Sequence, residues 1–266
     1  MNYLYETHLH TCQASACALS RGRDYIPAYK ALGYTGIIVT DHFFNGNSRL
    51  SRSLSWKDWV NRFCQGYEEA RDAGEQQGLD VFFGWEETFD GDDYLVYGLD
   101  KAWLLQHPEA AYWTRQEQYE TVKSYGGCVV QAHPFRQHYY IDTIHLSTAC
   151  VDAVEAANAS NEEQSYDALA MKYAQTLGLP VTAGTDIHDV RELGNPGMAF
   201  GVYLDKKMHT IGDYVAAIGE HTLGGLRMSP GRCDFQGNER VKLPVDIRDK
   251  TDQSTGEDLW ELLECR

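Results

Sequence analysis

An α/β fold is predicted, in which strands and helices alternate and the strands form a parallel sheet or barrel. Short runs of apolar, often β-branched residues at 36–40 and 128–132 are typical of strands buried in a parallel sheet. Residues 166–177 carry apolar side chains on one face at helical spacing. Histidines and carboxylates follow directly after the strands, where parallel α/β folds place their functional groups. These observations together predict the fold class and the place of the site.

The first half of the chain alternates between the two kinds of element. Aromatic and β-branched residues predict the strands, and the stretches between them have helical composition. Gly33 ends the first helix, since glycine commonly takes the left-handed conformation that follows a helix. The expected strands are 3–8, 36–40, 80–86, 93–99 and 128–132, and the expected helices are 25–32, 56–77 and 102–125.

The second half continues this pattern as far as residue 218. Ser160 and Glu163 form a capping box that opens a helix, and Gly178 and Pro180 end it. The other expected elements are strands at 151–156, 180–184 and 199–204 and a helix at 210–218. The sequence after Gly224 is polar and irregular. We therefore expect a catalytic domain at 1–224 and a C-terminal extension at 225–266 that packs on it.

The composition excludes several classes of protein. With 266 residues, 43% of them hydrophobic, the chain has enough apolar material for a core, which argues against a disordered or fibrous protein. Its 39 acidic and 23 basic residues give a net charge of −16, which disfavours nucleic acid and membrane surfaces as partners. The seven cysteines, from Cys12 to Cys265, include no CxxC pair, and the N-terminal residues show no signal-peptide pattern. We expect a reduced, cytoplasmic protein.

Five strand ends carry potential metal ligands. His8 and His10 stand two residues apart at the end of the first strand, so both imidazoles point to one face and can reach one metal ion. Asp186 and His188 repeat this spacing after a later strand. The other strand ends carry Asp41-His42, Glu86-Glu87 and His133-Pro134. Each group alone is more often a surface feature, but the agreement of all five predicts one metal cluster.

This ordered set of motifs resembles the PHP superfamily (polymerase and histidinol phosphatase). The matching stretches are His8-Leu9-His10-Thr11, Thr40-Asp41-His42, Gly84-Trp85-Glu86, Ala132-His133-Pro134, Val154-Glu155-Ala156-Ala157-Asn158 and Gly184-Thr185-Asp186-Ile187-His188. The resemblance implies a distorted seven-stranded (β/α) barrel. It also implies two or three divalent metal ions, usually zinc, manganese or iron, and the hydrolysis of phosphoesters.

The resemblance further implies roles for individual residues. The first ion would be held by His8, His10, Glu86 and Asp186. Glu86, rather than Glu87, would bridge to a second ion at His133, and His42 and His188 would serve a third. The residues expected to act in catalysis are Glu86, Asp186 and His188.

Two positions depart from the family pattern. Many members have Asp or His shortly after the HxHT motif, where this chain reads Ala16-Cys17. Cys12 or Cys17 could supply a thiolate there, although a buried inert thiol is the alternative. Many members also have a His where this chain reads Asp93-Tyr94. Asp93 could supply an oxygen ligand, or the position could stay open, so the second and third sites each lack one expected ligand.

The expected substrate is a small phosphomonoester, either similar to histidinol phosphate, a sugar phosphate or a nucleotide. Metal ions that activate a hydroxide suit attack on phosphorus, and a guanidinium suits contact with the phosphate oxygens. The candidate arginines are Arg136, Arg21 and Arg23, each with a surface ion pair as the alternative, and His138 is a further candidate for substrate contact. Glu155 and Asn158 are as consistent with a role at the barrel rim as with substrate contact.

Two other functions are weighed against this one. A nuclease acting on oligonucleotide ends is the second enzymatic interpretation, which the acidity and the absence of a Lys/Arg stripe disfavour. A catalytically degenerate metal-binding or regulatory domain is the third. The sequence predicts neither the identity of the phosphoester nor the oligomeric state.

Overall fold

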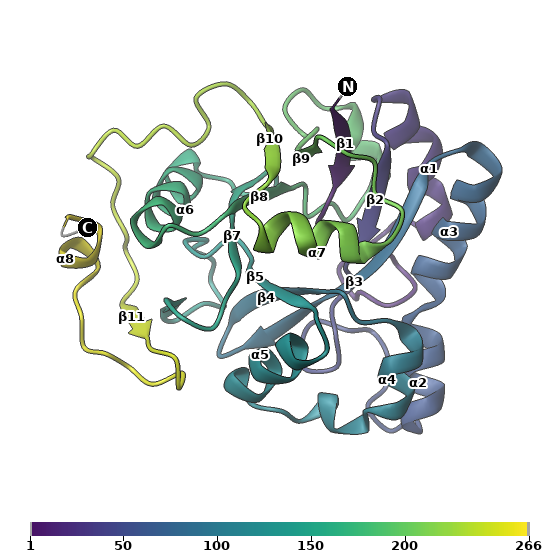
Figure 1. Ribbon diagram of the computed structural model, residues 1–266, viewed down its shortest axis with the longest axis horizontal. Coiled ribbons are helices and arrows are strands. Elements are labelled where there is room, and N and C mark those ends of the chain that lie inside the picture. The colour runs from purple at the N-terminus through teal and green to yellow at the C-terminus, as the bar shows by residue number, and fades with distance from the viewer. Residues whose placement is uncertain (1, 265–266) are drawn as a thin grey trace.

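Nine strands form one curved sheet in the computed structural model, which describes residues 2–264 and so leaves Met1, Cys265 and Arg266 outside (Figure 1). In the order in which they lie side by side, the strands are β10 (Leu223–Arg227), β9 (Gly201–Leu204), β1 (Tyr3–Glu6), β2 (Gly36–Val39), β3 (Asp80–Phe89), β4 (Asp92–Tyr97), β5 (Cys128–Gln131), β7 (Ala153–Asn158) and β8 (Val181–Gly184). The mixed α/β class is confirmed, and the predicted count of seven strands is wrong.

Six of these strands end on the same side of the sheet. β1, β2 and β3 are mutually parallel, as are β5, β7 and β8, and β4 runs antiparallel between β3 and β5. The turn from β3 to β4 contains Asp90 and Gly91 with φ angles of 52° and 94°, and two positive φ angles are what a tight two-residue hairpin requires. The sheet is therefore not purely parallel, because this hairpin inserts one reversed strand.

The sheet curls until its β8 end approaches β1, without a regular ladder between the two. β1 pairs along Tyr3–Tyr5 with the antiparallel β9, which occupies the edge that a closed barrel would give to β8. Beyond the strands, a bridge between Leu9 and Ile187 joins the two sides. Below that bridge Glu6 accepts hydrogen bonds from the backbone N–H groups of His8 and Thr185, at 2.8 and 3.0 Å. A nearly closed barrel results, with β9 and β10 as additional strands.

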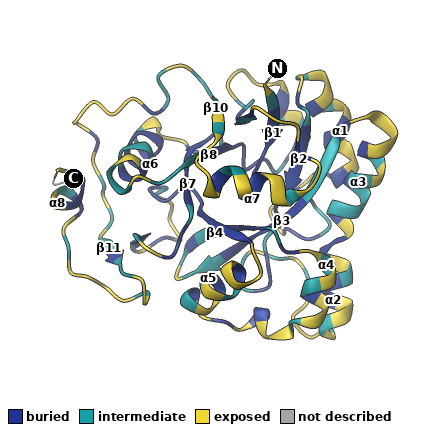
Figure 2. Cartoon of the chain, in the orientation of Figure 1, coloured by how far each residue is buried: buried dark blue, intermediate teal, exposed yellow. Residues whose placement is uncertain are grey.

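Helices cover the outside of the sheet, with their exposed faces turned to solvent while the strands are mostly buried (Figure 2). The α-helices are α1 (Gly22–Ala31), α2 (Trp56–Phe63), α3 (Gln65–Gln77), α4 (Lys101–Gln106), α5 (Arg115–Ser124), α6 (Gln164–Leu177), α7 (Ile211–Gly219) and α8 (Leu259–Glu264). Two 3₁₀-helices are η1 (Pro108–Ala111) and η2 (Val190–Gly194). Among residues 2–264, no helix combines the length and the apolar character needed to cross a membrane.

Three helix predictions need correction. The helix expected over 56–77 is two helices, which meet at Cys64. The helix expected over 102–125 is interrupted by η1, since Pro108 cannot donate the hydrogen bond that a continuing helix needs. The capping box expected at Ser160 does not form, because α6 begins only at Gln164. The Ser160 hydroxyl instead donates to the carbonyl oxygens of Thr185 and Asp186, at 2.8 and 3.0 Å.

The C-terminal segment contains regular structure that the sequence did not indicate. β11 (Val245–Arg248) pairs in parallel with β6 (Ile144–Ser147) in a separate two-stranded sheet. α8 buries Leu262 in a hydrophobic cluster that includes Tyr173 of α6. In Figure 1 this yellow segment runs along the side of the molecule at α6. Residue 224 lies inside β10. The predicted boundary at 224 between a catalytic domain and a C-terminal extension stays a prediction.

Candidate metal centre

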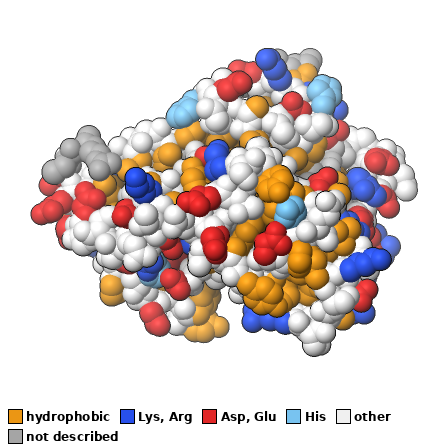
Figure 3. Space-filling view, turned by 60° about the horizontal axis from the view of Figure 1, so that its bottom comes forward, with side chains coloured by type: hydrophobic (Ala, Val, Ile, Leu, Met, Phe, Trp, Pro, Cys, Tyr) orange, Lys and Arg blue, Asp and Glu red, His pale blue; other side chains and the backbone are white. Residues whose placement is uncertain are grey.

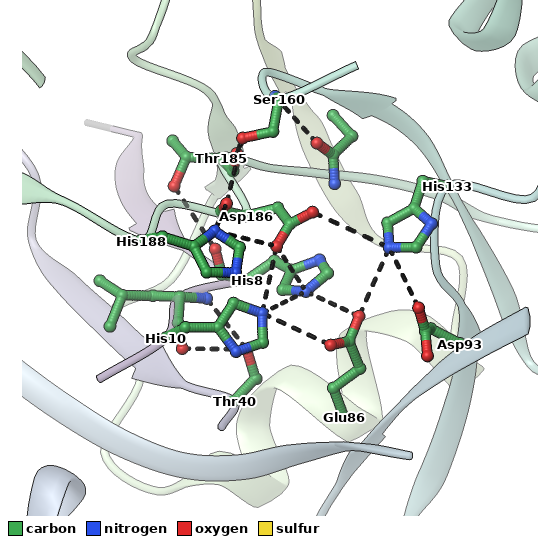
Figure 4. Close-up of polar contacts among 12 residues, drawn as sticks. His8, His10, Thr40, Glu86, Asp93, His133, Ser160, Thr185, Asp186 and His188 are labelled. Atoms are coloured by element: carbon green, nitrogen blue, oxygen red, sulfur yellow. Dashed lines mark hydrogen bonds and ion pairs between the residues drawn. The ribbon is translucent and has the colours of Figure 1, made fainter. Parts of the chain in front are cut away.

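The predicted ligands meet at the mouth where the parallel strands end. All but one follow a strand: His8 and His10 come after β1, His42 after β2, His133 after β5, and Asp186 and His188 after β8, while Glu86 lies within β3. Figure 4 shows the imidazoles of His8, His10, His133 and His188 around the carboxylates of Glu86 and Asp186. Because neighbouring residues of a strand point to opposite faces, Glu87 faces away from this cluster. Its carboxylate accepts instead from Trp113 and Gln118.

Four of these residues approach one another as ligands of a single ion do. The Nε2 atoms of His8 and His10 lie 3.2 Å apart. His8 Nε2 lies 3.0 Å from Glu86 Oε1, and His10 Nε2 lies 3.1 Å from Asp186 Oδ1. Ligand atoms about 2.0–2.2 Å from a tetrahedral zinc ion are separated by roughly 3.3–3.5 Å. The donor atoms of His8, His10, Glu86 and Asp186 lie 3.0–3.5 Å apart, which is close to this spacing.

Hydrogen bonds on the far side of each ring fix which nitrogen is free. His8 Nδ1 lies 3.0 Å from the Glu155 carboxylate, which can only accept, so Nδ1 carries the proton. His188 Nδ1 likewise donates to the backbone carbonyl of Asp186, at 2.8 Å. His10 Nδ1 lies 3.1 Å from Ser15 Oγ, whose own proton goes to Asp41 at 2.6 Å. The Nε2 lone pairs of all three histidines are therefore available to a metal ion.

Glu86 provides the clearest sign that a cation fits here. Its carboxylate is 1% exposed, and its only close polar neighbours in the described chain are imidazole nitrogens, with His42 Nδ1 2.7 Å from Oε2 and His8 Nε2 3.0 Å from Oε1. Burial alone would raise the pKa of Glu86, but the imidazoles of His42 and His8 lower it well below its usual range. A buried, ionised carboxylate is costly unless positive charge, from an imidazolium or a bound cation, compensates it. The nitrogen and oxygen donors around Glu86 are those that zinc, manganese and iron accept, so the residues fit a metal centre.

The two central histidines differ in their protonation. Burial and the neighbouring His42 imidazole lower the pKa of His10 to about 3. Burial also opposes charge on His8, but the carboxylates of Glu155, Asp186 and Glu86 raise its pKa well above 6.5. The carboxylates that favour a proton on His8 Nε2 also favour a divalent cation bound to that atom. Metal binding therefore requires the loss of this proton, as is usual for histidine ligands.

A second group of potential ligands consists of Glu86, Asp93 and His133, whose donor atoms lie within 4.8 Å of one another. His133 Nε2 is 3.4 Å from Glu86 Oε1 and 3.9 Å from Asp93 Oδ2. The Thr88 hydroxyl donates to the other oxygen of Asp93 at 2.6 Å and so orients it. Tyr94 lies on the other face of β4, where its hydroxyl lies 3.1 Å from that of Ser147. The reversed strand thus brings Asp93, and not Tyr94, to the cluster.

The third group combines His10, His42 and His188, whose donor atoms also lie within 4.8 Å of one another. Cys17 lines the cavity beside this group and is exposed to it, so it is not a buried inert thiol. Burial raises the pKa of Cys17, but hydrogen bonds with His188 and His42 outweigh burial and lower the pKa to about 7. Cys12 is not among the residues that line the cavity. The structure therefore places Cys17 beside His42 and His188.

Two candidate ligands have unusual backbone conformations. His133 and Asp186 have φ angles of 27° and 52°, in the region that non-glycine residues rarely adopt. The Glu155 carboxylate accepts from the backbone N–H of His133 at 3.2 Å, and the backbone N–H of Asp186 donates to the His8 carbonyl at 2.8 Å. Such conformations persist where the surroundings hold them, commonly at functional sites. Sequence patterns left the role of Glu155 open, and the structure shows it bound to both His8 and His133.

The cluster lies at the bottom of a cavity of about 570 Å³. Arg136 lines this cavity and is held by three side chains: it donates to Asp186 at 2.7 Å and to Asn158 and Asn161 at 2.9 Å each. Tyr139 and Tyr140 also line it, although no sequence motif indicated them. The candidates nearest to them in the sequence were His133, Arg136 and His138.

Three predicted substrate-binding residues do not line the cavity. Arg21 pairs with Glu69 of α3 on the surface, and Arg23 is exposed beside Asp24. His138 packs against the rings of Tyr139 and Tyr140, with ring centroids 4.6 Å apart in each case. The two arginines lie at the start of α1, where nearby carboxylates bind them. They are close to the first motif in the sequence, but their side chains point away from the cavity.

The sequence matches no protein-family model and no curated protein. Its structure is similar to that of a two-domain protein from Bacteroides vulgatus ATCC 8482 containing a predicted PHP-like metal-dependent phosphoesterase, with a TM-score of 0.56 and 13% identity over 84% of this chain and 64% of that chain. PsfC from Pseudomonas syringae PB-5123 gives a TM-score of 0.56 at 15% identity over 87% and 93% of the two chains. An amidohydrolase from Chromobacterium violaceum, with bound sulfate and no metal, gives 0.48 at 14% identity over 80% and 96%.

The predicted resemblance to PHP proteins is thereby confirmed at the level of the fold. At 13 and 15% identity, what the chains share is the arrangement of strands and helices. This chain spans 64% of the length of the two-domain protein.

Proposed function

We propose that this protein is a metal-dependent phosphoesterase that hydrolyses a small phosphomonoester. The convergence of five histidines and three carboxylates at one strand-end mouth, with both oxygens of buried Glu86 facing imidazole nitrogens at its centre, carries this proposal. Arg136 at the same cavity adds the guanidinium that phosphate recognition uses.

Two or three divalent ions, of zinc, manganese or iron, fit the donor groups. The first set is His8, His10 and Glu86, joined by Asp186, whose Oδ1 lies 3.1 Å from His10 Nε2. The second set is Glu86, Asp93 and His133, and the third is His42 and His188 with Cys17 beside them. Bound divalent ions supply a nucleophilic hydroxide near neutral pH and neutralise charge on the phosphoryl oxygens. In this arrangement Glu86 is shared between the first two sets, which keeps them adjacent.

The charge of the cavity lining suits a phosphate dianion. Three carboxylates, those of Glu86, Asp93 and Asp186, and one guanidinium give the lining a formal charge of −2 with neutral histidines. Two divalent cations would change this charge to +2, which matches one doubly ionised phosphate group. The lining contains no lysine and no second arginine for further phosphates. On the face drawn in Figure 3, basic side chains are scattered among acidic ones, which favours a small substrate over an oligonucleotide.

Arg136 would bind and orient the phosphate. A guanidinium has five N–H groups, of which Asn161, Asp186 and Asn158 accept three, so two are left for the substrate. Because three side chains hold it, Arg136 loses little freedom when it binds phosphate oxygens.

His188 is the most exposed imidazole of the cluster, at 28% of its side chain, and its Nδ1 is fixed by the Asp186 carbonyl. With two ions bound, its Nε2 can carry a proton to the departing alcohol oxygen. With three ions bound, the same atom serves as a ligand, and the metal stoichiometry of the active protein distinguishes these roles.

Metal analysis together with a phosphatase assay tests the proposal. Purified protein supplied with zinc, manganese or ferrous iron should bind two or three ions and release phosphate from small phosphomonoesters. E86Q and D186N should lose metal and at least 10³-fold in kcat, while H209Q, which changes an exposed histidine at another surface, should retain both. Tight metal binding without turnover would indicate a regulatory domain, and faster cleavage of single-stranded DNA would indicate a nuclease; either result would overturn the proposal.

A further inference from the structure

Two asparagine side chains orient the Arg136 guanidinium. Asn161 Oδ1 accepts from Arg136 Nε, and Asn158 Oδ1 accepts from Arg136 Nη2, at 2.9 Å each. Both asparagines are buried, with Asn158 at the end of β7 and Asn161 in the segment that follows it. An asparagine amide can present either its oxygen or its NH₂ group, and only the oxygen can accept from a guanidinium. Both amides must therefore keep their oxygens toward Arg136 in order to hold it.

A buried carboxylate fixes the orientation of each amide. Asn158 Nδ2 donates to Glu155 Oε2 at 2.9 Å, which leaves the Asn158 oxygen for Arg136. Asn161 Nδ2 donates to Asp167 Oδ1 at 2.7 Å, so the Asn161 oxygen also faces Arg136. Asp167 Oδ1 accepts in addition from the backbone N–H of Asn158 at 3.2 Å. Asp167 of α6 thus acts on both asparagines.

Asp167 depends in turn on a positive charge beside it. The residue is 1% exposed, and burial raises its pKa. The opposing charge comes from Arg232, whose Nε donates to Asp167 Oδ2. Among the described residues, no other basic side chain pairs with Asp167. A buried carboxylate that loses such a partner takes up a proton or turns toward water, and either change loosens its hold on the Asn161 amide.

Arg232 also binds the backbone that carries the two asparagines. Its Nη2 donates to the carbonyl oxygen of Asn161 at 2.6 Å and to that of Asn158 at 3.3 Å. The neighbouring Cys233 is buried, with its Sγ 3.5 Å from the carbonyl oxygen of Ala156 in β7. The turn that carries Arg232 is therefore packed against the barrel, although it belongs to the segment expected to be a C-terminal extension.

We propose that Arg232 is a positioning residue for phosphate binding by Arg136. It holds Asp167 and the backbone of residues 158–161, and these in turn orient the two amides that hold Arg136. The proposal rests on the proposed phosphoesterase function and gives the C-terminal segment a part in the phosphate site. Because Arg232 does not line the cavity, its effect on phosphate passes through Arg136.

Calorimetric titration of the zinc-loaded protein with inorganic phosphate tests the proposal. R232M keeps an unbranched side chain but removes every hydrogen bond of the guanidinium. It should bind phosphate about tenfold more weakly than the wild-type protein, because the asparagines no longer hold the N–H groups of Arg136 toward the phosphate. Its zinc affinity should stay within about twofold of wild type, since none of the partners of Arg232 is a predicted metal ligand.

A double-mutant cycle shows whether the effect passes through Arg136. R136M/R232M should bind phosphate within about twofold of R136M alone, because the group that Arg232 positions is already absent. R227M is the matched control: Arg227 is also half-buried, but it donates to the Leu32 carbonyl at 3.1 Å, outside this network. It should bind phosphate as the wild-type protein does.

Two further variants keep the test decisive if R232M does not fold. R232K keeps the charge beside Asp167 but cannot bind the carboxylate and both carbonyls at once, so it should weaken phosphate binding by about threefold. N161A leaves Arg232 and Asp167 in place, removes an acceptor of Arg136, and should reproduce the tenfold loss expected of R232M. In turnover both variants should raise KM for a small phosphomonoester more than they lower kcat, because the lost contact binds ground and transition states alike.

Several results would overturn this proposal while leaving the proposed function in place. These are a wild-type phosphate affinity in R232M, or in both R232K and N161A, and a loss of equal size from R232M in the wild-type and R136M backgrounds. A parallel loss of zinc from R232M would likewise make Arg232 a structural residue. A zinc-loaded wild-type protein that neither binds phosphate nor releases it from any phosphomonoester would overturn the proposed function itself.

Discussion

Replacing Glu155 by Gln tests how the metal cluster is held in place. Glu155 is 1% exposed, and its two oxygens have separate partners. Oε1 lies 3.0 Å from His8 Nδ1, while Oε2 accepts from the backbone of His133 at 3.2 Å and from Asn158 at 2.9 Å. All three partners are donors. Gln has nearly the same shape, but one of its two terminal groups can only donate.

Either orientation of the new amide is unfavourable. If its oxygen faces His8, its NH₂ group opposes the N–H groups of His133 and Asn158, and buried donors are left unpaired. If its oxygen faces those two, its NH₂ group forces His8 to accept at Nδ1 and to carry its proton on Nε2, where the metal ligand is needed. The side chain at position 155 cannot move aside to avoid these contacts, because the backbone packs closely around it. Even a Cβ added to Gly184 would lie only 2.7 Å from Glu155 Oε1.

Both alternatives give a loss of similar size. Buried donors left without a partner cost about 1–3 kcal/mol. Loss of the group that orients a ligand histidine typically weakens metal binding by about 10–100-fold, and each factor of ten corresponds to about 1.4 kcal/mol. We therefore expect E155Q to bind zinc about 10–100-fold more weakly than the wild-type protein, with the fold intact.

Competition with a chromophoric zinc chelator measures this difference. E239Q is the matched control, because Glu239 is also buried but lies in the C-terminal segment and accepts from the Gln236 backbone at 2.7 Å. It should bind zinc within twofold of the wild-type protein. Zinc affinity of E155Q within twofold of wild type, with an unchanged circular dichroism spectrum, would refute the argument that Glu155 sets the state of His8.

Three further predictions concern other parts of the molecule. The cobalt-substituted protein should show a thiolate-to-cobalt absorption band in the near ultraviolet that C17S removes and C12S retains; a band that survives C17S would exclude Cys17 as a ligand. L262A should lower the free energy of urea unfolding by about 2–5 kcal/mol in a single transition, because Leu262 is 1% exposed in the cluster of α6 and α8; a change below 0.5 kcal/mol, or a separate C-terminal transition, would contradict this. Backbone hydrogen bonds from Thr210 and His209 lower the pKa of Asp213 below its unfolded value of 3.8. The ionised carboxylate therefore stabilises α7 at pH values above 3.8. This stabilisation is lost as the pH falls through the lower pKa of the folded state. D213N should accordingly reduce stability by about 0.5–1 kcal/mol at pH 7, and a difference that persists undiminished at pH 2 would oppose the argument.

The position of the cluster could be predicted because it depends on a simple rule. Parallel strands end on one side, so polar residues that follow each strand meet there whatever the details of the loops. His8 and His10 needed only the two-residue period of a strand. These parts of the site follow from local pattern and sheet direction alone. The choice of Glu86 over Glu87 came from the family resemblance, and the alternation of side chains along β3 agrees with it.

Other features depend on contacts between segments far apart in the chain. The partner of β6 is β11, about 100 residues later, and neither has a strong strand pattern. Glu69 holds Arg21 from a different helix. The reversed strand β4 did carry a local signal, since Asp90-Gly91 is a typical hairpin turn. Its consequence, the arrival of Asp93 at the cluster, required the position of β5 as well.

The open seam between β1 and β8 explains why the centre lies where it does. Only a partial ladder joins the two sides here: the backbone N–H of Asp186 donates to the His8 carbonyl at 2.8 Å and that of His10 to the Ile187 carbonyl at 3.1 Å, but the N–H groups of His8 and Thr185 have no backbone acceptor across the seam. Here β9 occupies the edge of β1, so the Glu6 carboxylate accepts from both backbones instead. The chain is then free to take a positive φ at Asp186, with the Ser160 hydroxyl bound to the Asp186 carbonyl. The irregular backbone at this seam turns Asp186 toward His8 and His10. The interruption of regular strand pairing therefore creates this arrangement of potential ligands.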